Sequence, residues 1–425
     1  MHRISLTAAD VDDAVRTLRP TAEAREDVQR TVADIIDMVR DGGDDAVRRL
    51  TERLDGARLE RSRVPAKAIA RALEGIGSDV REALELLIDN LRAVAGELLP
   101  PPTRVTLPLG QVVSTRYVPV QRAGVYVPGG RAAYPSSAVM AIVPAQVAAV
   151  PQIAVCSPPG AHGLPSTFVL AVCALLGVDE VYAIGGAQAV AAMALGTRAI
   201  PAVDLLVGPG NAYVEEAKRR LFGDVGIESL AGPSELLVLA DATAPVEALS
   251  ADLVAQAEHG SGSQSVLVST DGGFLDDVAV ALGDGQGTVM LAEVDGWDTA
   301  VAFANAYAPE HLQLMLADPD PLLAQIVHAG AIFLGPWSGT AFGDYVAGSN
   351  HILPTGGNTR FASGLSPFVY LRAQEIIEVP AEAVEGLAGP LQALAGAEGL
   401  PNHARSAAIR ADLVRDIETT KGHAS

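Results

Sequence analysis

Between about Gly124 and Gly335 the chain alternates short apolar segments with segments of helix length. This alternation is the strongest constraint on the fold, because strands joined by helices form parallel sheets with right-handed crossovers. The segments that we interpret as buried strands are GVYV, QIAVC, VYAIGG, VDLLVG, ELLVLA, SVLVS and AIFLG. The sequence therefore predicts an α/β fold.

The first hundred residues have a helical period instead. Apolar residues recur at intervals of three and four over 28–39, where Thr21 can cap the helix and Gly42-Gly43 can end it. A second helix is predicted over 65–99. The period then changes to two over 112–120, which predicts extended chain.

The C-terminal part begins with a loop over 336–364 that is rich in Gly, Ser, Asn and Thr. EIIEV is predicted as a last strand, and 381–395 and 402–419 as helices. This tail has too small a core to stand alone, so we expect it to dock on another surface such as a second subunit.

Composition excludes several classes of protein. The 425 residues include 51 Asp and Glu against 30 Lys and Arg, a formal charge of −21, which argues against binding a nucleic-acid backbone. Cys156 and Cys173 lie in apolar runs and are too few for a disulfide framework. Acidic residues interrupt the start where a signal peptide would be apolar, and apolar segments such as 168–178 are too short to span a bilayer. We expect a soluble cytoplasmic protein with no nucleic-acid or membrane partner.

Glycine turns follow several predicted strands, although no G-x-G-x-x-G fingerprint does. They are Gly129-Gly130, Gly185-Gly186 and Gly208-Pro209-Gly210. Each one alone is explained by a tight connection between a strand and a helix. Together, at the carboxyl ends of neighbouring parallel strands, they favour a ligand cleft.

Gln256 and His259 lie three residues apart in LVAQAEHGSGS, at the end of a predicted helix that Gly260 terminates. This spacing puts both side chains on one helix face, so that they can converge on one metal ion. The pair also has a purely structural explanation, because a helix C-terminus attracts histidine. Gln is an uncommon metal ligand, so the pair alone leaves both interpretations open.

Glu310 and His311 follow Pro309, which closes a predicted helix, and they open an apparent strand. A carboxylate beside an imidazole supplies two proton acceptors of different affinity, suited to activating water and to removing an alcohol proton. Adjacent strand residues point to opposite faces, so a shared role requires a bend at the strand start. The alternative is a solvated sheet edge.

The segment GDYVAGSNHILPTGG holds Asp344, Asn350 and His351 in a glycine-rich loop. Asp344 is a candidate hard oxygen ligand, because Gly343 and Gly348 let the chain wrap closely round a ligand. His351 is interpreted as a residue that stabilises the loop.

EGLPNH places Glu398 and His403 across a turn made by Gly399 and Pro401. Asn402 is a predicted N-cap, which puts His403 in the first turn of the last helix. The positive end of a helix disfavours imidazolium, and the neutral ring is the form that binds metal. The four candidate ligands contain nitrogen and oxygen but no thiolate, which suits zinc, with manganese or cobalt as alternatives; they are Gln256, His259, Asp344 and His403.

As a group, the motifs resemble those of the histidinol dehydrogenase family, zinc enzymes that complete histidine biosynthesis. The matching stretches run in order from about Tyr117 to His403 and cover most of the chain. They are GVYVPGG, YPSSAVMAIVPAQVAAV, IGGAQAVAAMALGT, VDLLVGPGNAYVEEAKR, AGPSELLVLAD, LVAQAEHGSGSQ, APEHLQL, GDYVAGSNHILPTGG and EGLPNHA.

The resemblance implies one zinc ion per subunit, with NAD as the second cofactor. It implies that Glu310 and His311 are the catalytic acid/base pair. The implied zinc ligands are Gln256, His259, Asp344 and His403. The implied substrate contacts are Ser234, Glu398, His311 and the four zinc ligands. The implied NAD contacts are Tyr126, Gln188 and Asn211. It further implies a homodimer with exchanged C-terminal tails, in which Glu398 and His403 serve the neighbouring site.

The implied fold has two Rossmann-like parallel-sheet domains. A helical segment over 1–24 comes first. The larger domain, with the metal and catalytic motifs, comprises 25–122 and 234–366; the nucleotide-binding domain is 123–233; the tail that docks on the partner is 367–425.

The implied reaction oxidises L-histidinol through the aldehyde to L-histidine with two NAD. Zinc would hold the substrate imidazole and amine, His311 would accept the alcohol proton, and Glu310 would activate water on the retained aldehyde.

The sequence departs from the family pattern at two places, of which the first, near the proposed substrate loop, leaves room for a shifted substrate. The segment after RFASGL reads SPFVYLRAQEIIEV, which is more aromatic than is usual, and Ile227-Glu228 stands where Ile-Asp is common. The alternatives are a related zinc- and NAD-dependent dehydrogenase of another polar diol, such as a sulfonated one, a zinc hydrolase, and a non-catalytic scaffold that binds metal for stability.

Overall fold

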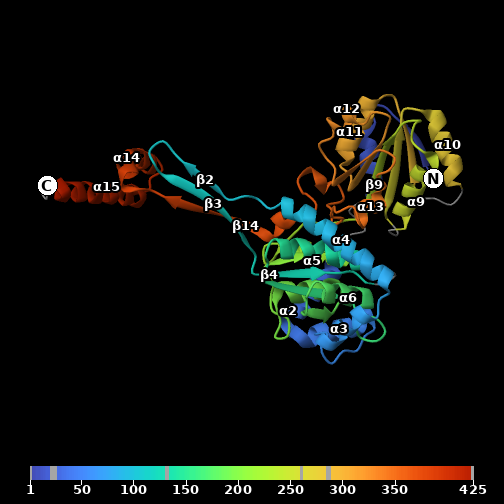
Figure 1. Ribbon diagram of the computed structural model, residues 1–425, viewed down its shortest axis with the longest axis horizontal. Helices are drawn as coiled ribbons and strands as arrows, with labels where there is room; N and C mark the ends of the chain where they lie inside the picture. Colours follow the sequence, from blue (N-terminus) through green and yellow to red (C-terminus); the bar gives the residue numbers. More distant parts are fainter. Residues whose placement is uncertain (1, 20–25, 130–133, 259–261, 284–288, 423–425) are drawn as a thin grey trace. The chain divides into compact units, whose positions relative to one another are not determined.

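The computed structural model describes residues 2–19, 26–129, 134–258, 262–283 and 289–422. The chain divides into two compact units (Figure 1). Unit 1 comprises 1–99 and 120–370, and unit 2 comprises 100–119 and 371–425.

Unit 1 contains a six-stranded sheet, here called sheet A, in which every pairing is parallel. Its strands, in spatial order, are β1 (His2–Leu6), β11 (Val289–Val294), β10 (Gln264–Ser269), β9 (Glu235–Ala240), β12 (His311–Met315) and β13 (Ala331–Leu334). The central strands β9 and β12 are buried along their whole length. AIFLG was predicted to be a buried strand, but it forms the edge strand β13. Its side chains alternate between partly exposed and exposed, because an edge strand has a neighbouring strand on one side only.

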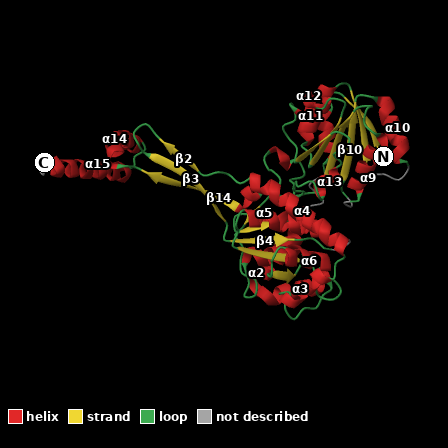
Figure 2. Ribbon diagram, in the orientation of Figure 1, coloured by secondary structure: helices red, strands yellow, loops and turns green. Residues whose placement is uncertain are grey.

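Helices cover both faces of sheet A (Figure 2). One face packs on α9 (Val246–Ala257) and α10 (Gly272–Leu282). The other face packs on α1 (Val11–Leu18), α11 (Trp297–Tyr307) and α12 (Asp320–Leu323).

A second parallel sheet, sheet B, also lies in unit 1. Its strands, in spatial order, are β6 (Val181–Ala183), β5 (Gln152–Ser157), β4 (Arg122–Tyr126), β7 (Leu205–Val207) and β8 (Gly226–Ile227). One core includes α2 (Glu26–Asp55), α7 (Gly186–Leu195) and α8 (Ala212–Leu221). The remaining helices are α5 (Pro135–Val147) and α6 (Thr167–Leu175), which pack on α4 (Ser78–Glu97) and α3 (Ala66–Glu74) respectively.

The two sheets share one topology. In sheet B the chain order from β4 onward is 3-2-1-4-5, and strands β9 to β13 of sheet A repeat it, with β1 added beside β11. This is the order of the first five strands of the doubly wound dinucleotide-binding fold, 3-2-1-4-5-6. The predicted fold, two Rossmann-like parallel sheets, is confirmed.

Two helix predictions need correction or refinement. The helix predicted over 65–99 is two helices, α3 and α4, separated by a break that contains Gly75 and Gly77. The stretch labelled α2 is two helices that meet at a kink at Gly42-Gly43, where the first was predicted to end, because Gly43 adopts the non-helical φ 50° and ψ −135°. The predicted cap Thr21 lies outside the described residues.

Unit 2 is an antiparallel sheet followed by two helices. The sheet order is β14 (Leu371–Glu378), β3 (Val112–Pro119) and β2 (Thr103–Thr106), and α14 (Ala381–Ala397) packs on α15 (Pro401–Gly422). Residues 100–119, predicted to belong to the larger domain, instead lie in unit 2, where β3 pairs with β14 of the tail. Asn402 is not an N-cap, because α15 already begins at Pro401; His403 does lie in the first turn.

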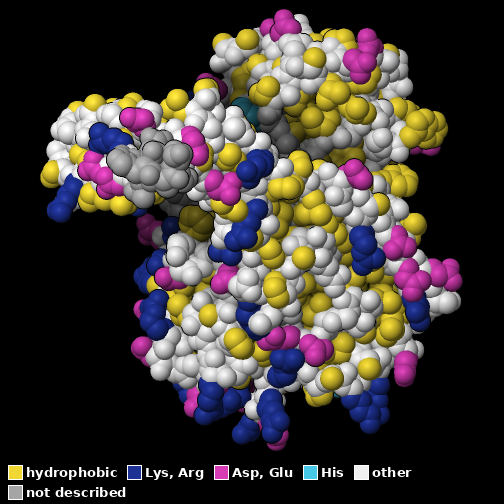
Figure 3. Space-filling model, turned by 60° about the vertical axis from the view of Figure 1, so that its left-hand side comes forward, with side chains coloured by type: hydrophobic (Ala, Val, Ile, Leu, Met, Phe, Trp, Pro, Cys, Tyr) yellow, Lys and Arg dark blue, Asp and Glu magenta, His cyan; other side chains and the backbone are white. Residues whose placement is uncertain are grey.

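The surface carries mixed charges. On the face shown in Figure 3, basic and acidic side chains are interspersed with apolar ones. Within the described ranges, no helix is both long and apolar enough to cross a membrane.

Candidate functional site

Glu310 and His311 form a buried pair at the entrance to β12. Helix α11 ends at a left-handed Ala308 (φ 47°), and the chain bends at Glu310 before β12 begins at His311. The two side chains are nearly inaccessible, with 7% and 3% exposed. The bend that a shared role requires is present, and the solvated-edge interpretation does not hold.

Two donors fix the Glu310 carboxylate. Its Oε2 accepts hydrogen bonds from Ser234 Oγ at 2.6 Å and from the Glu235 backbone N–H at 2.9 Å. The same oxygen lies 3.6 Å from His311 Nδ1, which is 3.2 Å from the Glu235 carbonyl oxygen. The start of β9 therefore orients both members of the pair.

Asp344, the last residue of α13 (Thr340–Asp344), lies on the other side of the imidazole. Its Oδ1 is 3.5 Å from His311 Nε2, and that nitrogen makes no hydrogen bond to any described residue. His351 holds the loop, since its Nδ1 is 2.7 Å from the Asp344 carbonyl oxygen and its Nε2 is 3.1 Å from Ser137 Oγ.

Nearby charges shift two pKa values. Burial alone would lower the pKa of His311, but the Glu310 and Asp344 carboxylates and the Glu235 carbonyl outweigh it and raise the pKa to about 9. Burial, with the Glu310 charge, raises the pKa of Glu235 to about 7 against the opposing charge of Arg19. Sequence reasoning missed Glu235, because nothing distinguishes an acidic residue in a buried strand from one at its solvated end.

Of the predicted metal ligands, two are described in unit 1. Gln256 lies in the last turn of α9 and donates from Nε2 to Ser263 Oγ at 3.0 Å, and Asp344 lies beside His311 as above. His259 lies outside the described residues. Glu398 and His403 lie in unit 2, where both are exposed.

The donor types suit a zinc ion. Carboxylate and imidazole are ligands that zinc prefers, and the amide is a less common one. The buried Nε2 of His311, with no hydrogen-bond partner among the described residues, lies 3.5 Å from Asp344 Oδ1. Among the residues that the structure describes, no three His, Cys, Asp or Glu side chains are grouped to hold a metal.

This site lies at the amino edge of sheet A. Glu235 and His311 are the first residues of β9 and β12, whereas ligands of open α/β sheets usually bind at the carboxyl edge. At the carboxyl edge of the same two strands, Asp241 links the loops that follow β9 and β12 by accepting from the backbone N–H groups of Thr243 and Ala317 at 2.9 Å each.

The predicted nucleotide contacts lie at the carboxyl edge of sheet B. Tyr126 ends β4, and its hydroxyl accepts from the Gly186 N–H at 3.1 Å; burial raises its pKa to about 12. Gln188 is fully buried and donates to Asp55 at 3.2 Å. Asn211 is exposed and caps α8. Of the three predicted contacts, Tyr126 and Gln188 are the two that lie beside Gly186.

Asp55 was missed by sequence reasoning, although a signal existed. It is the last residue of α2, where a carboxylate opposes the helix dipole. Burial raises its pKa against its hydrogen bond to Gln188.

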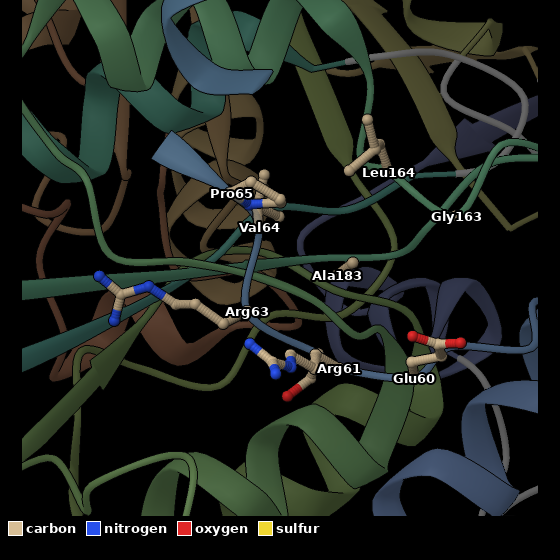
Figure 4. Close-up of a pocket in the computed structure, with 9 residues that line it drawn as sticks. Glu60, Arg61, Arg63, Val64, Pro65, Gly163, Leu164 and Ala183 are labelled. Carbon is tan, nitrogen blue, oxygen red and sulfur yellow. The ribbon is translucent and has the colours of Figure 1, made fainter. Parts of the chain in front are cut away.

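Two cavities lie near sheet B. The smaller, of about 230 Å³, is shown in Figure 4, where Glu60, Arg61 and Arg63 lie round it. The larger, of about 790 Å³, adjoins the carboxyl ends of β4 and β5. Its lining includes Pro128, Gly129, Ser157, Pro158, Arg71 and Ser166.

Two parallel sheets of doubly wound topology and a buried carboxylate–imidazole pair are features of the α/β enzyme class. Comparison with known proteins identifies the family. The family model described as histidinol dehydrogenase matches residues 18–411, and the chain belongs to the histidinol dehydrogenase family. The protein is accordingly an oxidoreductase.

Similar proteins agree over nearly full length. Histidinol dehydrogenase from Thermobifida fusca is 44% identical over 97% of this chain and 95% of its own, and that from Leifsonia xyli is 43% identical over 93% and 98%. The crystal structure of histidinol dehydrogenase from Elizabethkingia anophelis has a TM-score of 0.93 at 30% identity and covers 98% of this chain and 99% of its own. An acetylating aldehyde dehydrogenase from Geobacillus thermoglucosidasius, with a TM-score of 0.51 at 12% identity and coverage of 88% and 99%, shares the fold alone.

Proposed function

We propose that this chain is a zinc- and NAD-dependent enzyme that oxidises L-histidinol through L-histidinaldehyde to L-histidine, the last step of histidine biosynthesis. The observation that supports it most is the buried Glu310–His311 pair, held by Ser234 and the backbone of Glu235 in a protein of this family. Both steps of such an oxidation need a group that accepts a proton, from the alcohol in the first step and from water in the second.

His311 accepts the alcohol proton in the first step. The Glu235 carbonyl orients its Nδ1, and Nε2 is the ring nitrogen that makes no hydrogen bond to described residues, so Nε2 is the atom available to substrate. Only the neutral imidazole accepts a proton, and the flanking carboxylates favour the protonated form. The first step should therefore be faster on the alkaline side of neutrality.

Glu310 acts in the second step. Its carboxylate takes a proton from the water that adds to the aldehyde, and the hydrate then has the hydrogen that leaves as hydride. Ser234 and the Glu235 N–H both bind Oε2, so they hold the carboxylate in one orientation. Because both donors bind Oε2, the second oxygen, Oε1, is the atom that accepts the proton.

Zinc, when bound, holds the substrate imidazole and amine in position rather than changing oxidation state. We assign Gln256, His259, Asp344 and His403 as its ligands. Gln256 and Asp344 lie on α9 and α13, two elements that pack together. The same residues, with Ser234, His311 and Glu398, are proposed to contact substrate.

NAD, when bound, accepts one hydride in each oxidation. We assign Tyr126, Gln188 and Asn211 to its site at the carboxyl edge of sheet B. A cavity of about 790 Å³ lies at the same edge of the sheet, beside Pro128 and Ser157 at the carboxyl ends of β4 and β5, although none of the three assigned residues lines it.

A covalent thiol route is disfavoured. Cys156 and Cys173 are both fully buried among the elements of sheet B, and burial raises the pKa of both thiols. Neither is a reactive thiolate, so water rather than cysteine attacks the aldehyde.

A homodimer with exchanged tails is the proposed assembly. Unit 2 exposes many large apolar side chains, which suits a unit that docks on a second subunit. Those on β14, α14 and α15 are Ile376, Ile377, Leu391, Leu394, Ile409 and Leu413.

The test is the stoichiometry of NADH. Purified protein is given limiting L-histidinol, a sulfonated diol, or an ester with no alcohol to oxidise, each with and without NAD. Two NADH per histidinol support the proposal. One NADH per histidinol, turnover of the sulfonated diol alone, or ester hydrolysis without NAD would each refute it.

A further inference from the structure

Three segments of unit 1 hold the proposed ligands and base. Helix α9 has Gln256, strand β12 has His311, and the segment 338–344, which includes α13, ends on Asp344. A second set of contacts joins the same three segments. Gln313, which is fully buried on β12, donates from Nε2 to Asp252 Oδ2 at 2.8 Å and to the Ser338 carbonyl oxygen at 3.3 Å.

The geometry places this second set directly beneath the first. Gln313 lies two residues after His311 on β12, so both side chains point to the same face of sheet A, about 6.6 Å apart along the strand. Asp252 lies four residues before Gln256 on α9, one turn away on the same helix face, about 6 Å along the axis.

The two displacements also have the same direction. Helix α9 connects the parallel strands β9 and β10, so it runs antiparallel to them and to β12. The direction from Asp252 to Gln256 along α9 is therefore the same as the direction from Gln313 to His311 along β12. Met315, two residues further along β12, confirms the face, because it packs in the core that includes α9.

The third segment is equally close. A Cβ added to Gly339, the residue before α13, would lie 3.0 Å from Asp252 Oδ1, so only glycine allows this approach without displacing the carboxylate. Asp252 and the start of the segment that ends on Asp344 are thus in direct contact.

We propose that Asp252 and Gln313 are positioning residues, whose hydrogen bond sets the spacing of the three segments that hold Gln256, His311 and Asp344. This inference rests on the proposed function, since it assigns those three side chains to metal and substrate. Asp252 and Gln313 touch neither and act through the elements to which they belong.

The test compares variants that remove one hydrogen-bonding group. Gln313→Met keeps the approximate side-chain volume and removes the amide with its donor, and Asp252→Ala removes the acceptor. Asp252→Asn keeps an oxygen that can accept from Gln313. Asp271→Ala is the matched control, because Asp271 caps α10 of the same sheet by accepting from the Phe274 N–H and contacts none of the three segments.

Zinc affinity is measured by competition with a colorimetric chelator, beside kcat, KM and the thermal unfolding midpoint. We expect Gln313→Met and Asp252→Ala each to weaken zinc binding about 10- to 100-fold. The double variant should be no more than about twofold worse than either, because both remove one interaction. Asp252→Asn should stay within about threefold of wild type, and Asp271→Ala should lower the midpoint only.

Unchanged zinc affinity in Gln313→Met and Asp252→Ala, or losses that multiply in the double variant, would overturn the inference. Wild-type protein that holds no zinc while making two NADH per histidinol would overturn the inference and the metal assignment but not the reaction. Wild-type protein that makes no NADH would overturn the proposed function itself.

Discussion

Replacing Glu310 by Gln should separate the two oxidation steps. The change is nearly isosteric, and one oxygen of the amide can still accept from Ser234 Oγ and from the Glu235 N–H, the two bonds that hold the carboxylate at 2.6 and 2.9 Å. The site therefore keeps its shape. The variant loses the charge and the ability to take a proton from water.

The expected magnitude follows from that loss. A positioned general base contributes about 10²- to 10⁴-fold, so conversion of the aldehyde to the acid should slow by that factor. The first oxidation uses His311, whose ring keeps its contact with the Glu235 carbonyl in this variant, and it should slow much less.

The assay is single-turnover stopped flow at the NADH absorbance, started separately from histidinol and from histidinaldehyde. Asp241→Asn is a matched control, since Asp241 lies at the opposite end of β9 and also accepts two backbone N–H bonds. It should leave both rates unchanged. Equal slowing of the two steps in Glu310→Gln would refute the division of roles between Glu310 and His311.

Three further outcomes follow. Burial raises the pKa of Glu215 to about 7 against the Lys218 charge, so the folded state retains a proton that the unfolded chain releases above about pH 4.5. The free energy of unfolding should therefore fall between about pH 4.5 and 7, by at most about 1.4 kcal/mol per pH unit. Urea titrations of Glu215→Gln should show a flatter fall, and an unchanged slope would contradict the assignment. Chelation of zinc should abolish histidinol binding in calorimetry while circular dichroism stays native, because both parallel-sheet cores are apolar; unfolding on chelation would contradict a positioning role. Mixing His403→Asn with Glu310→Gln subunits should restore about a quarter of wild-type activity, since half of the random dimers are hybrids with one intact site, and no recovery would argue against exchanged tails.

The fold was predictable because its signals are local. In ELLVLA every position after Glu235 is apolar, which is typical of a strand buried on both faces, and β9 is buried throughout. Local signals also explain the failures. The break at Gly75 was hidden by continuous helical periodicity, and β1, which pairs with β11 far along the chain, depends on contacts that no short window contains.

The site was predictable only in part. Glu310 and His311 stand together in sequence, so their chemistry could be inferred and only the bend remained to be seen. Gln313 and Asp252, or Gln188 and Asp55, meet across elements distant in the chain, and a buried amide looks the same in sequence whether or not it has a partner.

The central claim is that four distant side chains gather round one divalent cation beside Glu310 and His311. Anomalous scattering at the zinc edge, from crystals of the metal-loaded protein, tests it most directly. One peak per subunit in contact with Gln256, His259 and Asp344, and with His403 of the partner subunit, is the predicted result. A peak elsewhere, or bound zinc that leaves Asp344 without contact, would contradict it.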